Sequence, residues 1–219
     1  MPTTSRRQKE KEDRKGAILA AAREVFFEQG IRRATVEAVA ARAEVAKGTV
    51  YLYFESKETI LAHLLLEGLD SLGERLEEAF DESADLTGEA RLRRLAAAYL
   101  DYYQNESDYF RLMMAFDRGH FQEAVSADVY EMILHRSLRG LRWVVRAIEQ
   151  GMEAGEFAAG DAKKQAGMFW AALNGVLVLI SHPLRRELVE QEVETLYAGV
   201  METMLRGMKN PKLQTSNPK

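Results

Sequence analysis

Residues 35–54 read TVEAVAARAEVAKGTVYLYF, and this segment holds two short runs of apolar residues at helical spacing. Thr35 can accept a hydrogen bond from the first turn of a helix, and the apolar residues after it recur at helical spacing. Glu44 and Val45 interrupt this pattern, and a second short helix is predicted over residues 46–54. Two short helices joined by a tight turn, with a longer helix before them, are typical of the motif that places a recognition helix in the major groove of DNA.

The longer helix is predicted just before this stretch. It starts in the charged segment of residues 8–15 and ends at Gly30, because glycine readily adopts the left-handed conformation that closes a helix. Its apolar face consists of Ile18, Leu19, Ala22, Val25 and Phe26. This face needs a packing partner, and the two short helices can supply it.

The outer residues of the second short helix suit a DNA surface. They supply a positive charge and several hydroxyl groups for phosphate oxygens, and a glycine that lets the backbone approach the sugar-phosphate chain. They are Lys47, Gly48, Thr49, Tyr51 and Tyr53. Val50 and Phe54, four residues apart, can point inward and fix the seat of the helix. In the alternative interpretation, the two tyrosines are core aromatics of a small helical domain.

Positive charge gathers in the first part of the chain. Residues 1–60 hold 12 lysines and arginines against 9 aspartates and glutamates, which gives this part a charge of +3. The net charge of the chain is −4, so the remaining residues carry a charge of −7. Lys57 lies in the first turn of the next helix, where its ammonium and unpaired backbone N–H groups can together hold one phosphate. Affinity for a polyanion therefore belongs to this part, although a split of this size without a motif would be ordinary scatter.

The segments TVEAVA at residues 35–40 and KGTVYLYFESKE at residues 47–58 closely resemble the DNA-binding domain of TetR-family transcriptional regulators. The likeness extends over about residues 12–62, and a weaker likeness continues in residues 108–113 and 170–176. It implies an all-α homodimer that binds operator DNA and carries a variable effector-binding domain. The positions that touch bases or phosphates in the family correspond to Thr35, Lys47, Thr49, Tyr51, Leu52, Tyr53 and Lys57, of which Leu52 is at a variable position.

Two residues at the turn depart from the family pattern. Glu44 stands where the family usually has glycine, and Ala46 stands where a small hydroxyl residue is frequent. A non-glycine residue at positive φ costs about 1 kcal/mol, and an alanine side chain cannot cap a helix. We expect a turn that is locally less stable, with the outward-facing residues 47–57 left intact.

Almost every periodic stretch of the chain has the helical repeat, which predicts an all-α fold. A three-helix DNA-binding domain at residues 1–58 is followed by a larger helical effector-binding and dimerisation domain at residues 59–208 and a flexible tail at 209–219. Ser56 and Asp161 are predicted helix caps. The helices predicted after the motif cover residues 57–80, 89–104, 107–117, 121–153, 162–182 and 186–208.

The helices near residues 162–182 and 186–208 are predicted to form a homodimer interface. Residues 166–180 are apolar apart from Asn174 and the glycines, and the last helix has a stripe wide enough to touch two neighbours. Fifteen apolar residues fall short of the ~20 that cross a bilayer, so no membrane span is expected. Alternatively, these two helices complete the core of a monomer.

Aromatic and sulfur-containing residues gather in residues 99–121 and on later helices. Apolar walls with a few placed polar groups describe most small-molecule sites, so some of these residues are candidate contacts for an unidentified effector. The candidates are Tyr103, Phe110, Met113, Met114, Phe121, Trp143, Trp170 and Asn174. The alternative for each of them is plain core packing.

Composition and missing motifs argue against other classes of protein. The chain is 47% hydrophobic and 29% charged, which is typical of a folded protein, and its lack of cysteine permits a reducing compartment. Its first residues lack the apolar segment of a secretory signal, so a cytoplasmic protein is expected. Without a catalytic or phosphate-binding motif, and with four scattered histidines, no enzyme activity, cofactor or metal site is predicted. A protein that coats DNA without sequence preference is the remaining rival, against which the modest +3 argues.

Overall fold

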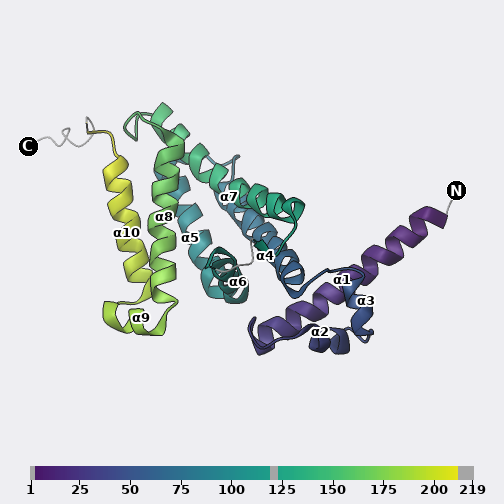
Figure 1. Cartoon of the computed structure of the whole chain (residues 1–219). Helices are drawn as coiled ribbons and strands as arrows, with labels where there is room; N and C mark the ends of the chain where they lie inside the picture. Colours follow the sequence, from purple (N-terminus) through teal and green to yellow (C-terminus); the bar gives the residue numbers. More distant parts are fainter. Residues whose placement is uncertain (1–2, 119–122, 212–219) are drawn as a thin grey trace, which may run out of the picture. The chain divides into compact units, whose positions relative to one another are not determined.

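The computed structural model describes residues 3–118 and 123–211, and the regular structure in these ranges is helical (Figure 1). The helices are α1 (Thr3–Gln29), α2 (Val36–Arg42), α3 (Lys47–Tyr51), α4 (Lys57–Phe80), α5 (Gly88–Asn105), α6 (Ser107–Arg118), α7 (Ala127–Glu153), α8 (Ala162–Ile180), α9 (Pro183–Val189) and α10 (Val193–Met208). A single isolated β-bridge pairs Phe157 with Lys209. The predicted all-α fold is confirmed.

Packing divides the chain into two compact units, each with segments from two parts of the sequence. The first unit consists of Met1–Leu69 and Asp108–Leu134, and the second consists of Asp70–Ser107 and His135–Lys219. Helices α4 and α7 therefore contribute residues to both units. The predicted domain boundaries after residues 58 and 208 stay predictions.

The first unit has a continuous hydrophobic core under the two short helices. The predicted apolar face of α1 is confirmed, because Ile18, Ala22, Val25 and Phe26 are buried and Leu19 packs against them partly buried. They pack with Val36, Val39 and Ala40 of α2, Val50 of α3, and Phe54, Ile60, Leu61 and Leu64. Full burial of a valine, leucine or phenylalanine side chain contributes about 1.5–3 kcal/mol, so this core holds α2 and α3 against α1 (Figure 1).

Side-chain caps begin three helices, and a glycine ends α1, at the predicted positions. Thr35, Ser56 and Asp161 each accept a hydrogen bond from the backbone N–H three residues further on, at 3.2, 3.0 and 3.1 Å. Gly30 follows α1 with a φ of +81°. These three caps and the glycine stop are confirmed.

The second unit depends on a close approach between α5 and α7. A Cβ atom on Gly88 would lie 2.6 Å from the Cα atom of Gly151, so only glycine fits there. The carboxylate of Glu156 accepts hydrogen bonds from the N–H groups of Gly88 and Glu89, both at 3.1 Å. It thereby satisfies two of the free donors at the start of α5.

The prediction of one helix over residues 186–208 is wrong. Two helices, α9 and α10, occupy this part of the chain, and Glu190 between them has a φ of +52°. Val189 and Val193 are four residues apart, so the apolar spacing continues across the break and hides it. The helix predicted from residue 121 begins at Ala127, and residues 119–122 lie outside the described ranges.

Among the described helices, no single one is both long enough and apolar enough to cross a membrane. Helices α8 and α9 meet the criterion when they are taken together, but the chain bends by 106° between them.

Candidate nucleic-acid interface

The turn between α2 and α3 keeps the left-handed geometry that glycine would favour, although Glu44 occupies the position. Glu44 has a φ of +52°. The N–H of Val45 donates to the carbonyl of Ala40 at 3.0 Å, and the N–H of Glu44 donates to the carbonyl of Ala41 at 3.2 Å. This pair of bonds is a Schellman motif, which satisfies the last carbonyls of α2. Ala46 precedes α3 without a side-chain cap, as predicted.

Glu44→Gly is expected to raise the free energy of unfolding by about 1 kcal/mol, because glycine removes the Cβ strain at positive φ. Urea denaturation followed by circular dichroism measures this gain. Glu44→Ala is the matched control, since it removes the same charge and keeps the Cβ atom. If alanine stabilises as much as glycine, the gain comes from charge and the strain argument fails.

Helix α3 has an inner and an outer face. Val50 and the following Phe54 are buried, as predicted, so they fix the seat of the helix. The candidate DNA-contacting residues lie elsewhere on the helix and just after it. Lys47, Gly48, Tyr51 and Leu52 are exposed, and Thr49 and Tyr53 are half-buried. Their contacts with DNA stay predictions.

Lys47 already has two partners in the free protein. Its ammonium forms an ion pair with Glu37 of α2 and lies 5.7 Å from the centre of the Tyr51 ring. A hydrogen bond from Lys47 lowers the pKa of Glu37, and the same bond raises the pKa of Lys47. Lys47 is therefore fully charged at neutral pH and oriented on the outer face. The pairing with Glu37 was not predicted, because it joins residues of two helices across the turn.

Lys57 is more deeply engaged than the sequence suggests. Its ammonium donates to the carbonyls of Ala34, at 2.7 Å, and Arg32, at 3.4 Å, and lies 5.6 Å from the centre of the Phe26 ring. These bonds fasten the loop before α2 to the start of α4. An ammonium has three donors, so one is left for the predicted phosphate contact.

His63 of α4 is a half-buried titratable group next to this motif. Its ring packs edge-on against Phe54, Nδ1 donates to the carbonyl of Thr59 at 2.9 Å, and Nε2 lies 3.0 Å from the ammonium of Lys15. Nε2 is then the acceptor, which requires a neutral imidazole. Burial lowers the pKa of His63, and the charge of Lys15 lowers it further, against the opposing effect of the Thr59 carbonyl.

The stability of the protein is therefore expected to fall in mild acid. With a lowered pKa in the folded state, His63 takes up its proton more readily after unfolding, so stability is complete above the unfolded pKa of ~6.5 and is lost as the pH falls from there toward the folded pKa. The slope should stay well below ~1.4 kcal/mol per pH unit, because water screens a half-exposed ring.

Melting temperatures between pH 5 and pH 8 measure this effect. His63→Gln should flatten the profile below pH 6.5, whereas the exposed His182→Gln should leave it unchanged. A wild-type profile that is already flat in this range would contradict the expectation.

The predicted effector contacts are spread over both units. Phe110 is buried, Tyr103, Met113, Met114, Trp143 and Asn174 are half-buried, Trp170 is exposed, and Phe121 lies outside the described residues. The Tyr99 hydroxyl donates to the side-chain oxygen of Asn174 at 2.9 Å. The Trp143 ring lies 4.8 Å from that of Phe80, and its Nε1 finds no acceptor among the described residues. Their role in binding an effector stays a prediction.

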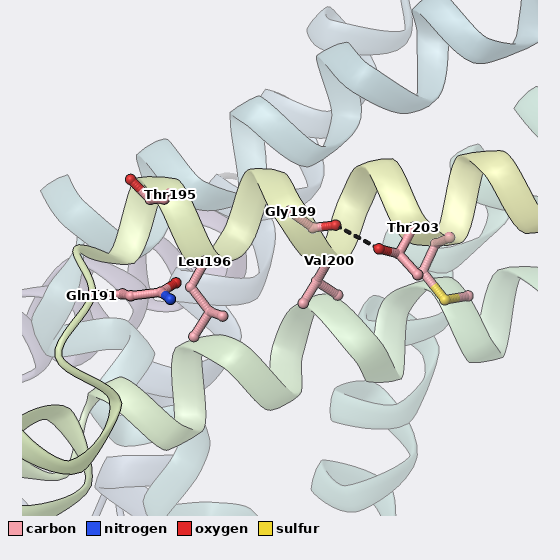
Figure 2. A pocket seen from close by; sticks show the side chains of 7 residues that line it. Gln191, Thr195, Leu196, Gly199, Val200 and Thr203 are labelled. Carbon is pink, nitrogen blue, oxygen red and sulfur yellow. Dashed lines mark hydrogen bonds between the residues drawn. The ribbon is translucent and has the colours of Figure 1, made fainter.

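A shallow groove of about 230 Å³ runs along α10 (Figure 2). It is lined by Gln191, Thr195, Leu196, Gly199, Val200, Thr203 and Met204, none of which is among the predicted effector contacts. Leu196 and Val200 point to the same side of α10, and the Thr203 hydroxyl donates to the carbonyl of Gly199 at 2.9 Å (Figure 2). The groove therefore offers an apolar surface on a helix predicted to form the dimer.

Comparison with known proteins identifies the motif. Residues 18–64 match the family described as "Bacterial regulatory proteins, tetR family". The chain is 31% identical over 107 residues to the transcriptional activator FasR of Mycolicibacterium smegmatis, which covers 49% of this chain and 48% of FasR. It is 42% identical over 76 residues to the fatty acid metabolism regulator protein of Bacillus subtilis, which covers 35% of this chain and 39% of that protein. The matches thus span less than half the length of these two relatives.

The fold also matches solved structures. The structure of the transcriptional regulator FadR from Bacillus subtilis with stearoyl-CoA has a TM-score of 0.67 at 23% identity and covers 88% of this chain and 98% of that one. The helical fold and the exposed outer face of α3 after a tight turn define a domain of the helix-turn-helix class. Residues 18–64 are therefore similar to the DNA-binding domain of bacterial regulatory proteins of the tetR family.

Proposed function

We propose that this protein is a transcriptional repressor that binds a palindromic operator as a homodimer and is released by a small-molecule effector. The observation that carries the proposal is the outer face of α3. Lys47, Thr49 and Tyr51 lie on this face, and the buried Val50 on the inner face fixes the helix to the core. A charged, hydroxyl-rich helix held on a rigid core is what major-groove recognition requires. A protein that binds bacterial operator DNA acts in the cytoplasm, so we propose a cytoplasmic location.

The exposed apolar surface of α8 and α10 supports the dimer. Met168 and Trp170 of α8 are 48% and 43% exposed, and Leu196, Val200 and Met204 line the groove on α10. Apolar side chains that gather on two adjoining helices mark an interaction site, and a second copy of the same surface is the occupant that we propose. Two recognition helices would then enter successive major grooves ~34 Å apart.

An effector that favours a different spacing of the recognition helices would weaken operator binding. Such coupling is typically worth ~1–3 kcal/mol, and DNA would weaken effector binding by the same factor. The relative named as a fatty acid metabolism regulator and the structure that holds stearoyl-CoA make long-chain acyl-CoA the first effector class to test. Stearate and free coenzyme A separate recognition of the chain from recognition of the nucleotide part.

Selection of bound duplexes from random DNA tests the function. A regulator should favour the selected duplex over random DNA by at least ~10³, whereas a DNA-coating protein should show steep salt dependence and no preference. Absence of any preferred duplex would overturn the proposal. Wild-type protein mixed with stearoyl-CoA should then release the selected duplex.

The same duplex separates the roles of two residues. Thr49→Ala is expected to change base preference at one position in each half-site, with little change in salt dependence. Lys57→Ala is expected to weaken binding to all sequences and to flatten the salt slope by about one unit per protomer. Lys57 also donates hydrogen bonds to two backbone carbonyls, so the melting temperature of the Lys57→Ala variant must be measured to separate lost DNA contacts from lost stability. Losses of the same kind from both variants would refute this division of roles.

A further inference from the structure

The first half of α1 extends beyond the core of its unit. The helix begins at Thr3, and its N-terminal part runs out past α2 and α3 (Figure 1). From residue 6 on, the first fully buried residue is Ile18, and residues 6–14 are exposed. At 1.5 Å per residue, the 11 steps along the helix from Ile18 back to Arg7 carry it about 17 Å past the core. The family match begins at residue 18, so this extension lies outside it.

Positive residues form a stripe on one side of this extension. Arg7, Lys11 and Arg14 follow each other at spacings of four and three residues, within a sector of ~60° around the helix. The same spacing continues into the buried Ile18 and Val25, which face the core beneath α2 and α3. The stripe therefore lies on the side of α1 that carries the helix-turn-helix motif.

The acidic residues of the extension leave the stripe uncompensated. Glu10 at its edge accepts from Arg6 at 2.9 Å, and Glu12, on the far side, accepts from Gln8 at 2.9 Å. Asp13 also lies on the far side of the helix. Within the described part of the chain, the three stripe residues form no ion pair, so their charges are available to an outside polyanion.

We propose that the stripe of Arg7, Lys11 and Arg14 binds the phosphate backbone of the DNA that flanks the base pairs read by α3. The proposal rests on the proposed operator binding and adds a second contact to it. An extension of about 17 Å spans roughly half of a ~34 Å helical turn of duplex. Contacts of arginine and lysine with phosphates carry no sequence information, so the stripe adds affinity and salt dependence but no specificity.

Two double variants of the full chain test this proposal on the selected operator duplex. R7A/K11A removes two charges from the stripe, and R6A/K9A removes two charges from the other side of the same helical segment. Both replace the same residue types by alanine, the best helix former, so the helix should persist in both. R7A/K11A is expected to flatten the salt slope by about 1.8 per bound protomer and to weaken binding at least ~10-fold near 0.1 M salt, whereas R6A/K9A should change the slope by less than about 0.5.

A duplex trimmed to the half-sites supplies an independent measurement. Without flanking phosphates, wild type and R7A/K11A should bind equally. The proposal is overturned if the salt slopes of the two double variants are equal, or if R7A/K11A keeps the wild-type salt slope. It is also overturned if wild type and R7A/K11A differ in affinity as much on the trimmed duplex as on the full one. A wild-type protein with no preferred duplex refutes operator recognition itself, and a wild-type protein that binds no DNA refutes both.

Discussion

Changing Met168 and Val200 together to aspartate is expected to turn the proposed dimer into monomers and to weaken operator binding at least ~100-fold. Both side chains lie on the exposed apolar surface of α8 and α10, where a partner copy would bury them. An unpaired carboxylate buried in an interface costs several kcal/mol. Two linked recognition helices gain ~10²–10⁴ in avidity over one, and this gain disappears in the monomer.

Sedimentation and operator titration measure the two effects. The single chain should still fold, since Met168 is 48% exposed and Val200 is only half-buried, whereas Val176 on the same unit is 6% exposed and unsuitable for such a test. Leu138→Asp is the matched control, because Leu138 is an apolar residue of α7 that is 53% exposed. A double variant that remains dimeric would place the interface on another surface.

Arg91→Met is expected to lower the free energy of unfolding by about 3–5 kcal/mol. Arg91 is 5% exposed, and its guanidinium donates to the carbonyls of Phe80, of Asp81 at 2.6 Å, and of Ala84 at 2.7 Å. It also lies 4.6 Å from the centre of the Phe80 ring. Methionine fills much of the volume but leaves these carbonyls without donors, and each lost bond to a charged group costs ~1.5–3 kcal/mol before relaxation.

Calorimetry should show a fall in melting temperature of about 10 °C, at ~2–4 °C per kcal/mol for a chain of this size. Arg94→Met on the same helix is the control, because Arg94 is exposed and its distance to Asp81 is 3.7 Å. The control should change stability by less than about 1 kcal/mol. Equal losses from the two variants would mean that charge, and not the capped carbonyls, sets the stability.

The candidate site was predictable where its determinants are local. The inward Val50 and Phe54 and the positive φ at Glu44 follow from spacing or from the family likeness. The ion pair of Lys47 with Glu37 and the bonds of Lys57 to two carbonyls were not predictable. These partners are 10 to 25 residues apart and lie on different helices and loops, so only the folded unit brings them together.

Local sequence patterns alone predict the all-α class, the caps at Thr35, Ser56 and Asp161, and the motif from residue 35 onward. Each depends on groups three or four residues apart, which a helix brings together without help from the rest of the fold. Tertiary structure alone decided that Arg91 caps the end of α4 and that Glu190 separates α9 from α10. Burial and chain reversal depend on distant packing, which apolar spacing along one chain does not encode.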